Sequence, residues 1–146
     1  VATSSKGATN NKGVNGTYKV TVYDSANAPV LDKSFDLTTT ANKISLDLAP
    51  GTYTATITSE FALARTVSIV VGDADIAGPA IAMIVCDYNK DTNITGADAT
   101  AVYSAASKAA DLRYDLNGDG SVTGADATAV FAIASSPIAL PDVTIK

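Results

Sequence analysis

The sequence lacks several of the side chains on which most enzyme chemistry depends. It contains no histidine and no tryptophan, and it has one cysteine, Cys86, one methionine, Met83, and one glutamate, Glu60. Without histidine the chain can form no Ser-His or Cys-His nucleophile and no imidazole metal site. A single glutamate leaves few carboxylates for a glycosidase acid/base pair, because six of the fourteen aspartates fall at repeated loop positions. The composition therefore predicts that this chain is not an enzyme.

Charge and hydropathy exclude two further classes of function. The formal net charge is −5 and the isoelectric point is about 4.4, whereas binding to nucleic acid phosphates requires basic patches. No apolar run reaches the roughly 18 to 20 residues that a membrane-spanning helix needs. No signal peptide is recognisable, so we expect a mature protein or an excised fragment. The lone cysteine follows apolar residues 81–85, which favours a buried, inert thiol over a reactive or intermolecular one.

The first half of the chain predicts β structure. Residues 1–14 are rich in Ser, Thr, Asn and Gly and predict a linker. From residue 15 to residue 82, alternating apolar residues are interrupted repeatedly by Gly, Pro and Asp turns. Residues 43–48 and 52–58 alternate most clearly. This pattern predicts an antiparallel β-sandwich over residues 15–82.

After Cys86 the apolar periodicity changes to that of a helix. Apolar residues fall at i, i+3, i+4 and i+7 in two segments, and each set predicts one buried helix face. The two sets are Ala99, Val102, Tyr103 and Ala106, and Ala127, Val130, Phe131 and Ala134. Pro137 is expected to end the second helix. We expect the tail, residues 138–146, to pack back on the β region.

A repeat spans this helical region. The sequence DYNKDTNITGADATAV begins at residue 87, and DLNGDGSVTGADATAV begins 28 residues later. Oxygen-bearing residues recur at positions 1, 3, 5, 7, 9 and 12 of each copy, which is the ligand spacing of a calcium loop. The predicted ligands are Asp87, Asn89, Asp91, Asn93 and Asp98 in the first loop, and Asp115, Asn117, Asp119, Ser121 and Asp126 in the second. The alternative is a pair of acidic turns that bind nothing, which the duplication disfavours.

The two loops differ from the usual calcium loop in informative ways. Position 12 is Asp rather than Glu in both. Position 6, where a glycine eases the turn, is Gly120 in the second loop but Thr92 in the first, so we expect the first loop to be strained or weaker. Neither loop follows a full helix, and a sensor would use a Met-rich groove. These features disfavour a calcium sensor.

On these residues the segment 83–137 resembles the dockerin family, the calcium-binding modules of cellulosome assembly. The resemblance rests on the duplicated D-x-N-x-D…D loop and implies two calcium ions, a cohesin domain as partner and an extracellular, cell-surface location. Residues 15–82 resemble the X module that adjoins some dockerins, which implies an Ig-like or prealbumin-like sandwich and a scaffoldin parent. The implied fold is thus two domains, an all-β sandwich followed by a small all-α dockerin of two half EF-hand repeats. The implied function is to assemble or cell-anchor a cellulosome that degrades plant polysaccharide.

The expected cohesin-binding surface lies on the outward faces of the two helices, which are unusually apolar for exposed positions. It comprises Ala97, Thr100, Ala101, Ser104, Ala105 and Lys108 on the first helix, and Ala125, Thr128, Ala129, Ala132 and Ile133 on the second. The alternative is that the alanines pack in a core of small residues. The repeat makes two binding orientations conceivable, but Ser104-Ala105 against Ala132-Ile133 breaks the symmetry. We therefore expect one dominant orientation.

Two other functions are compatible with the β region. One is a surface adhesin stabilised by an isopeptide bond, with Lys19 and Glu60 as members of the site. The other is a carbohydrate-binding module with Tyr18, Tyr23 and Tyr53 as an aromatic platform.

Overall fold

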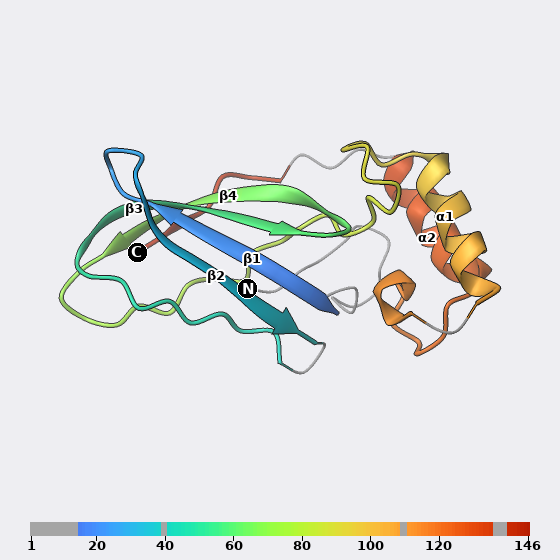
Figure 1. Ribbon diagram of the computed structural model, residues 1–146, viewed down its shortest axis with the longest axis horizontal. Coiled ribbons are helices and arrows are strands. Elements are labelled where there is room, and N and C mark those ends of the chain that lie inside the picture. Colours follow the sequence, from blue (N-terminus) through green and yellow to red (C-terminus); the bar gives the residue numbers. More distant parts are fainter. Residues whose placement is uncertain (1–14, 39–40, 109–110, 136–139) are drawn as a thin grey trace.

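The protein consists of one β-sheet with a pair of helices beyond one end of its strands (Figure 1). The computed structural model describes residues 15–38, 41–108, 111–135 and 140–146, so the predicted linker over residues 1–14 lies outside the described residues. The elements are β1 (Gly16–Tyr23), β2 (Pro29–Leu37), β3 (Gly51–Ser59), β4 (Ala62–Val71), α1 (Gly96–Ala106), the 3-10 turn η1 (Leu112–Tyr114), α2 (Gly124–Ala134) and β5 (Thr144–Ile145).

The sheet has the strand order β2-β1-β3-β4-β5. The first four strands pair antiparallel, and β5, which follows the helices in the chain, pairs parallel with β4. Alternate residues of the central strands are buried on one face, as the period of two requires. They are Tyr18, Val20 and Val22 of β1, Ala55 and Ile57 of β3, and Val67 and Ile69 of β4.

The β-sandwich predicted for residues 15–82 is wrong, because the described residues form one sheet and not two packed sheets. Residues 43–48, expected to be a strand, run extended along the buried face without a backbone hydrogen bond to another described residue. Their Ile44, Leu46 and Leu48 are half-buried against the core. Period-two alternation reports that one side of a segment is buried, but it does not say whether a neighbouring strand completes a ladder.

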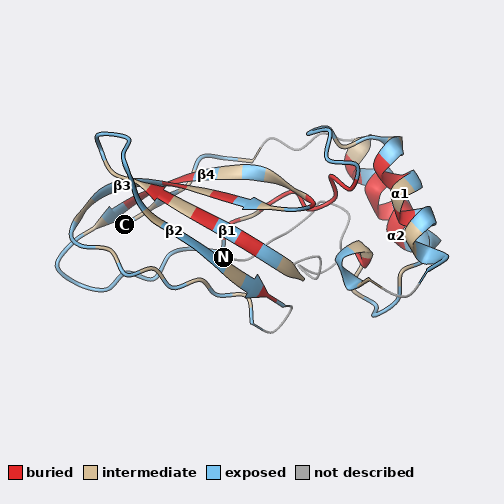
Figure 2. Cartoon of the chain, viewed as in Figure 1, coloured by how far each residue is buried: buried red, intermediate tan, exposed pale blue. Residues whose placement is uncertain are grey.

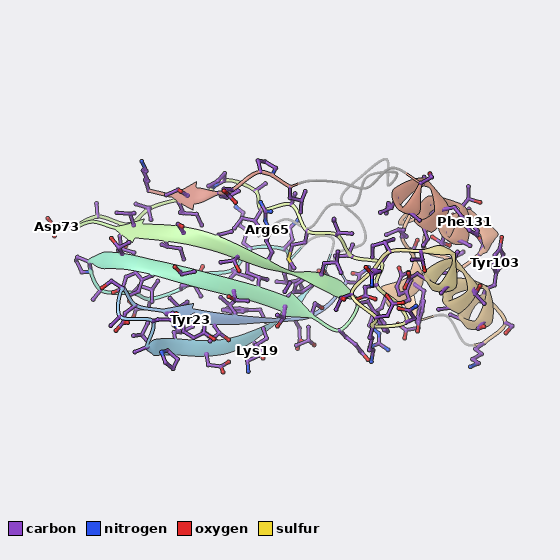
Figure 3. All side chains as sticks on the ribbon, turned by 90° about the horizontal axis from the view of Figure 1, so that it is seen from above. Lys19, Tyr23, Arg65, Asp73, Tyr103 and Phe131 are labelled. Atoms are coloured by element: carbon purple, nitrogen blue, oxygen red, sulfur yellow. The ribbon has the colours of Figure 1, made fainter. Side chains whose placement is uncertain are left out.

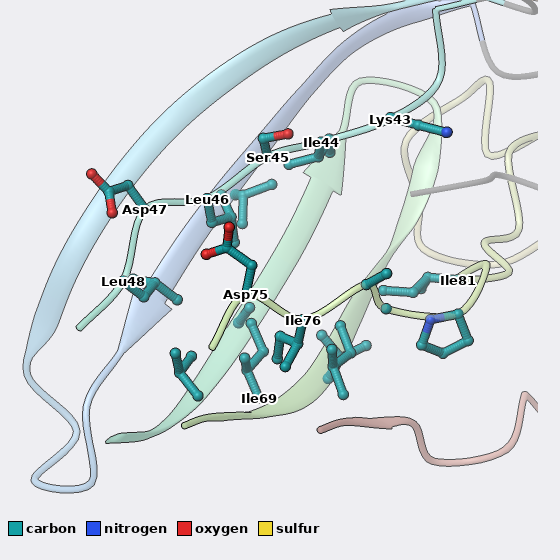
Figure 4. A pocket seen from close by; sticks show the side chains of 18 of the residues that line it. Lys43, Ile44, Ser45, Leu46, Asp47, Leu48, Ile69, Asp75, Ile76 and Ile81 are labelled. Carbon is teal, nitrogen blue, oxygen red and sulfur yellow. The ribbon is translucent and has the colours of Figure 1, made fainter. Parts of the chain in front are cut away.

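A cavity remains where a second sheet would pack. It has a volume of about 870 Å³ and lies between the buried face of the sheet and the two extended segments 42–48 and 72–81 (Figure 4). Ile44 and Leu46 approach it from one segment and Ile76 and Ile81 from the other. Irregular chain therefore covers this face in place of the predicted strands.

Residues 81–88 connect the sheet to the helix pair through a shared hydrophobic cluster. These residues are buried except for Ala82, although they form neither helix nor strand (Figure 2). Buried side chains of the sheet, of this segment and of both helices belong to one hydrophobic cluster. The backbone N–H of Leu63 donates to the carbonyl of Ile84 at 2.9 Å, which ties the segment to the start of β4.

Candidate functional site

The repeated acidic segments fold into two similar turns, loop one (residues 87–98) and loop two (residues 115–126). In loop one the carboxylate of Asp87 accepts hydrogen bonds from the N–H groups of Asp91 (3.1 Å) and Thr92 (3.0 Å). In loop two Asp115 accepts from the same positions, 5 and 6, at 3.1 and 2.9 Å. The position-1 aspartate therefore organises the first half of each loop.

The position-12 aspartates organise the second half of each loop. Asp98 accepts from the N–H groups of Asn89 (3.1 Å) and Thr95 (2.8 Å), and Asp126 makes the matching bonds in loop two at 3.1 and 2.8 Å. The Thr95 hydroxyl in turn caps α1, so that the loop end and the helix start form a capping box, which loop two repeats. This explains why each helix begins directly after a threonine and carries an aspartate in its first turn.

The backbone of loop one is strained at two positions. Position 4 is Lys90 with φ 64° and position 6 is Thr92 with φ 69°, whereas loop two has Gly118 and Gly120 there. A residue with a Cβ in this left-handed region costs roughly 1–2 kcal/mol, and a β-branched one is uncommon. The expected strain in loop one is therefore confirmed.

Four loop aspartates are buried without a cationic partner among the described residues. Asp87 and Asp115 are 5% and 3% exposed, and Asp98 and Asp126 are 0% exposed. The ion pairs of the described residues all involve other acids. Backbone N–H groups satisfy these carboxylates as acceptors, but burying their charge remains costly without a counter-charge. The loops are therefore electrostatically suited to a bound cation.

The donor chemistry of the loops fits calcium in particular. Within the described ranges, no three Cys, Asp or Glu side chains are drawn together tightly enough to form a metal cluster by themselves. Each loop mixes carboxylates with amide, hydroxyl and backbone oxygens, and calcium takes six to eight oxygens of these kinds. The side chains at positions 3 and 5 currently bond each other, Asn89 to Asp91 at 2.8 Å and Asn117 to Asp119 at 3.0 Å.

Cys86 precedes loop one directly and is fully buried, as the sequence predicted. Burial, reinforced by the nearby charges of Asp98 and Asp87, raises the pKa of its thiol to about 12. The thiol is therefore protonated and unreactive at neutral pH.

The structure places most of the predicted partner surface on the outside of the helices. Exposed or half-buried positions are Ala97, Thr100, Ala101, Ser104, Ala105, Lys108, Ala125, Thr128 and Ala132. The expectation that Ala129 and Ile133 face outward is wrong, because they are 8% and 2% exposed. The buried face of α2 is wider than the periodicity indicated and includes both residues.

Two aromatic residues that were assigned to the core instead lie on the surface. Tyr103 is 54% exposed and Phe131 is 48% exposed (Figure 3). A Cβ placed on Gly96 at the start of α1 would lie 3.2 Å from the Phe131 ring, and one on Gly124 would lie 3.5 Å from the Tyr103 ring. Each ring therefore lies over the glycine that begins the other helix, in an arrangement that follows the repeat. Their exposure could have been predicted from the sequence, because each helix begins with a glycine and carries one aromatic residue among small residues.

The structure does not favour either alternative function. Lys19 forms an exposed ion pair with Asp32 (3.0 Å), whereas Glu60 pairs with Lys90 and Arg113, so each proposed isopeptide residue is engaged with other side chains. Tyr18 is buried, and Tyr23 and Tyr53 are half-buried, so the three rings do not form an exposed platform.

Comparison with known proteins identifies one segment. Residues 85–132, about one third of the chain, match the family model of the dockerin type I domain, and the match includes both loops and most of both helices. A dockerin is a non-catalytic, calcium-dependent module that binds cohesin in cellulosome-type assemblies, which are typically extracellular. No curated protein and no solved structure matched the chain. None of the helices in the described residues is long and apolar enough to cross a membrane.

Proposed function

We propose that this chain is a calcium-dependent cohesin-binding module in which each loop holds one calcium ion. The observation that carries the proposal is the pair of fully buried position-12 aspartates, Asp98 and Asp126, which have no cationic partner in the described residues. The ligands would come from Asp87, Asn89, Asp91, Asn93 and Asp98, and from Asp115, Asn117, Asp119, Ser121 and Asp126.

Calcium would supply the positive charge that these carboxylates lack. The protein's own residues set the loop shape, because Asp87 and Asp98 already hold the backbone through four N–H groups in loop one. The side chains at positions 3 and 5 would exchange their mutual bond for the ion. Since three carboxylates per loop repel each other without a cation, ion binding contributes directly to the stability of the helix pair.

The cohesin-binding surface is proposed to centre on Tyr103 and Phe131. Aromatic residues are enriched among the anchors of protein interfaces, and these two are the large exposed hydrophobic side chains of the helices. The smaller residues around them are Ala97, Thr100, Ala101, Ser104, Ala105, Lys108, Ala125, Thr128 and Ala132. The phenol of Tyr103 has no counterpart on Phe131, which supports one dominant orientation on the partner.

The wider context is also proposed. An extracellular scaffoldin end that anchors to a cell-surface cohesin agrees with a dockerin segment joined closely to a sheet of its own. In this reading the sheet takes the place of an X module and supports the loops.

Calorimetry with type I cohesin domains tests the proposed function. Binding is expected in millimolar calcium and should disappear when a chelator is added. Binding of equal strength in the chelator, or no binding to any cohesin in calcium, would overturn the proposal.

A further inference from the structure

Two cationic side chains converge on Glu60, which lies in the turn between β3 and β4. One carboxylate oxygen of Glu60 accepts a hydrogen bond from Lys90 Nζ at 2.7 Å, and the other pairs with the guanidinium of Arg113. Lys90 is position 4 of loop one, and Arg113 lies two residues before loop two. The only glutamate of the chain therefore links the two loops to the sheet.

An aromatic cluster underlies these ion pairs. Phe61 packs against Tyr88 and Tyr114 with ring centroids 5.3 and 5.1 Å apart, and the two tyrosines stack at 4.7 Å. Lys90 and Arg113 both lie over the Phe61 ring, at 5.5 and 5.1 Å from its centroid. Cation–π contacts of this kind strengthen the hold on both cations.

Backbone contacts connect the same turn to the first calcium ligand. The N–H of Asp87 donates to the carbonyl of Phe61 at 3.0 Å, and the Tyr88 hydroxyl donates to the carbonyl of Arg113 at 3.2 Å. The side chain of Asp111 also accepts from Arg113, which fixes the guanidinium in place. The position of Glu60 is therefore transmitted to the start of each loop through neighbouring contacts.

Lys90 is an unusual neighbour for a calcium ion. Lys90 is a residue of loop one, and its positive charge would oppose a bound cation if it turned toward the ligands, while loop two has Gly118 at the same position. Glu60 offsets this charge and directs the ammonium group toward the sheet. Glu60 likewise pairs with the guanidinium group of Arg113, which lies beside loop two.

We infer that Glu60 is a positioning residue for both calcium loops, holding Lys90 and Arg113 toward the sheet so that the loops are ordered together and cation binding is not opposed. The inference rests on the proposed function, since it assumes that the loops bind calcium. It assigns the β3–β4 turn a part in calcium affinity that the loop sequences alone do not indicate.

The test is a calcium titration of the full chain carrying Glu60→Gln, which keeps the shape of the side chain and removes its charge. The matched control is Asp32→Asn, which removes the same charge from the exposed Lys19–Asp32 pair on β1 and β2. Glu60→Gln is expected to weaken calcium binding about three- to tenfold, as the loss of two partly exposed ion pairs allows, and the control less than twofold. Circular dichroism in saturating calcium checks that both variants are folded.

A double-mutant cycle shows whether Glu60 acts through Lys90. In a Lys90→Gln background, Glu60→Gln is expected to cost less calcium affinity than in the wild type, because one of its two partners is already gone. Equal calcium affinities for Glu60→Gln and Asp32→Asn, with a wild type that binds calcium, would overturn this inference alone. A melting temperature lowered without any change in calcium affinity would also overturn it, leaving Glu60 a purely structural role. A wild type that takes up no calcium would overturn the proposed function together with it.

Discussion

Loop one and loop two share four hydrogen bonds from backbone N–H groups to the aspartates at positions 1 and 12, with different residues at positions 4 and 6, and loop two adds one from Gly118. Loop two uses Gly118 and Gly120, while loop one uses Lys90 and Thr92 in the same left-handed backbone region. Loop one is also fixed more tightly to the sheet, through the Asp87 N–H and the Lys90–Glu60 pair. The repeat thus keeps the carboxylates that shape each loop, while the intervening positions adapt loop one to its contact with the sheet.

The largest expected effect comes from removing the position-12 aspartate of either loop. Asp98→Ala and Asp126→Ala each remove a proposed ligand and leave two backbone N–H groups without an acceptor, about 1–3 kcal/mol for each group. Since loss of an outer-shell partner alone typically costs 10–100-fold, calcium affinity of the altered loop should fall by at least about 100-fold. Calorimetry should then show one ion per chain in place of two. A stoichiometry of two in either variant would contradict the ligand assignment, and exposed Asp47→Asn serves as the control.

The next largest effect is on cohesin affinity, and it tests whether α1 and α2 contribute equally to binding. Phe131→Asp is expected to weaken cohesin binding by about 2 kcal/mol or more, roughly 30-fold, as for an aromatic interface anchor. Tyr103→Asp should have a clearly different effect if one orientation dominates. Surface plasmon resonance against one cohesin measures both, with exposed Thr52→Asp on β3 as a control for added charge outside the proposed surface. Matched losses for Phe131→Asp and Tyr103→Asp would show that both orientations are used.

Calcium removal should make the thiol of Cys86, which directly precedes loop one, more reactive. The thiol is fully buried, so it should react slowly with a disulfide reagent in calcium. When a chelator loosens the loop, the pKa falls toward its ordinary value of 9.0, and the thiolate fraction and access both increase. The thiolate fraction grows about tenfold for each unit by which the pKa falls, but the thiolate is then less nucleophilic, so the rate at pH 8 should rise at least about threefold. An unchanged rate would mean that calcium does not order the start of loop one.

Sequence reasoning was most successful where chemistry repeats. The match to the dockerin model covers the repeated loops, and both helices begin after the threonines that precede GADATAV. It was least successful for the second layer of the β region, because alternation in residues 43–48 records burial and not strand pairing. It also exchanged Phe131 and Ile133, since both are apolar and lie at opposite edges of one helix face, and only tertiary packing decides which edge is covered.

The contacts of Glu60 illustrate a different limit. Glu60, Lys90 and Arg113 are far apart in the sequence, and no local pattern connects them. Their meeting depends on how the β3–β4 turn approaches the loops, which is a property of the folded chain. A single glutamate in an acidic protein is a conspicuous residue, but its partners could not have been named in advance.

A smaller effect is expected from exchanging the position-6 residues. Thr92→Gly should relieve the left-handed strain of loop one, and after the entropic cost of glycine the net gain in stability is about 0.5–1 kcal/mol. Gly120→Thr should destabilise loop two by a comparable or larger amount, because threonine would be strained in the left-handed backbone conformation that Gly120 adopts. Thermal unfolding in calcium measures both. Equal and opposite shifts would show that the loops differ at this position by strain alone.

The smallest effect is a pH dependence carried by Glu60. The hydrogen bond from Lys90, aided by the charges of Lys90 and Arg113, holds the pKa of Glu60 below its ordinary value of 4.5, although burial opposes the shift. Because the folded-state pKa is the lower one, the stabilisation is complete above pH 4.5 and is lost as the pH falls through the folded value. Glu60 is about half exposed, so solvent screening limits each of its two ion pairs, which Glu60→Gln removes, to about 0.5 kcal/mol. Melting temperatures in saturating calcium should therefore differ slightly at pH 7 and converge in acid, whereas a difference that persists at pH 3 would show that the charge of Glu60 is not its source.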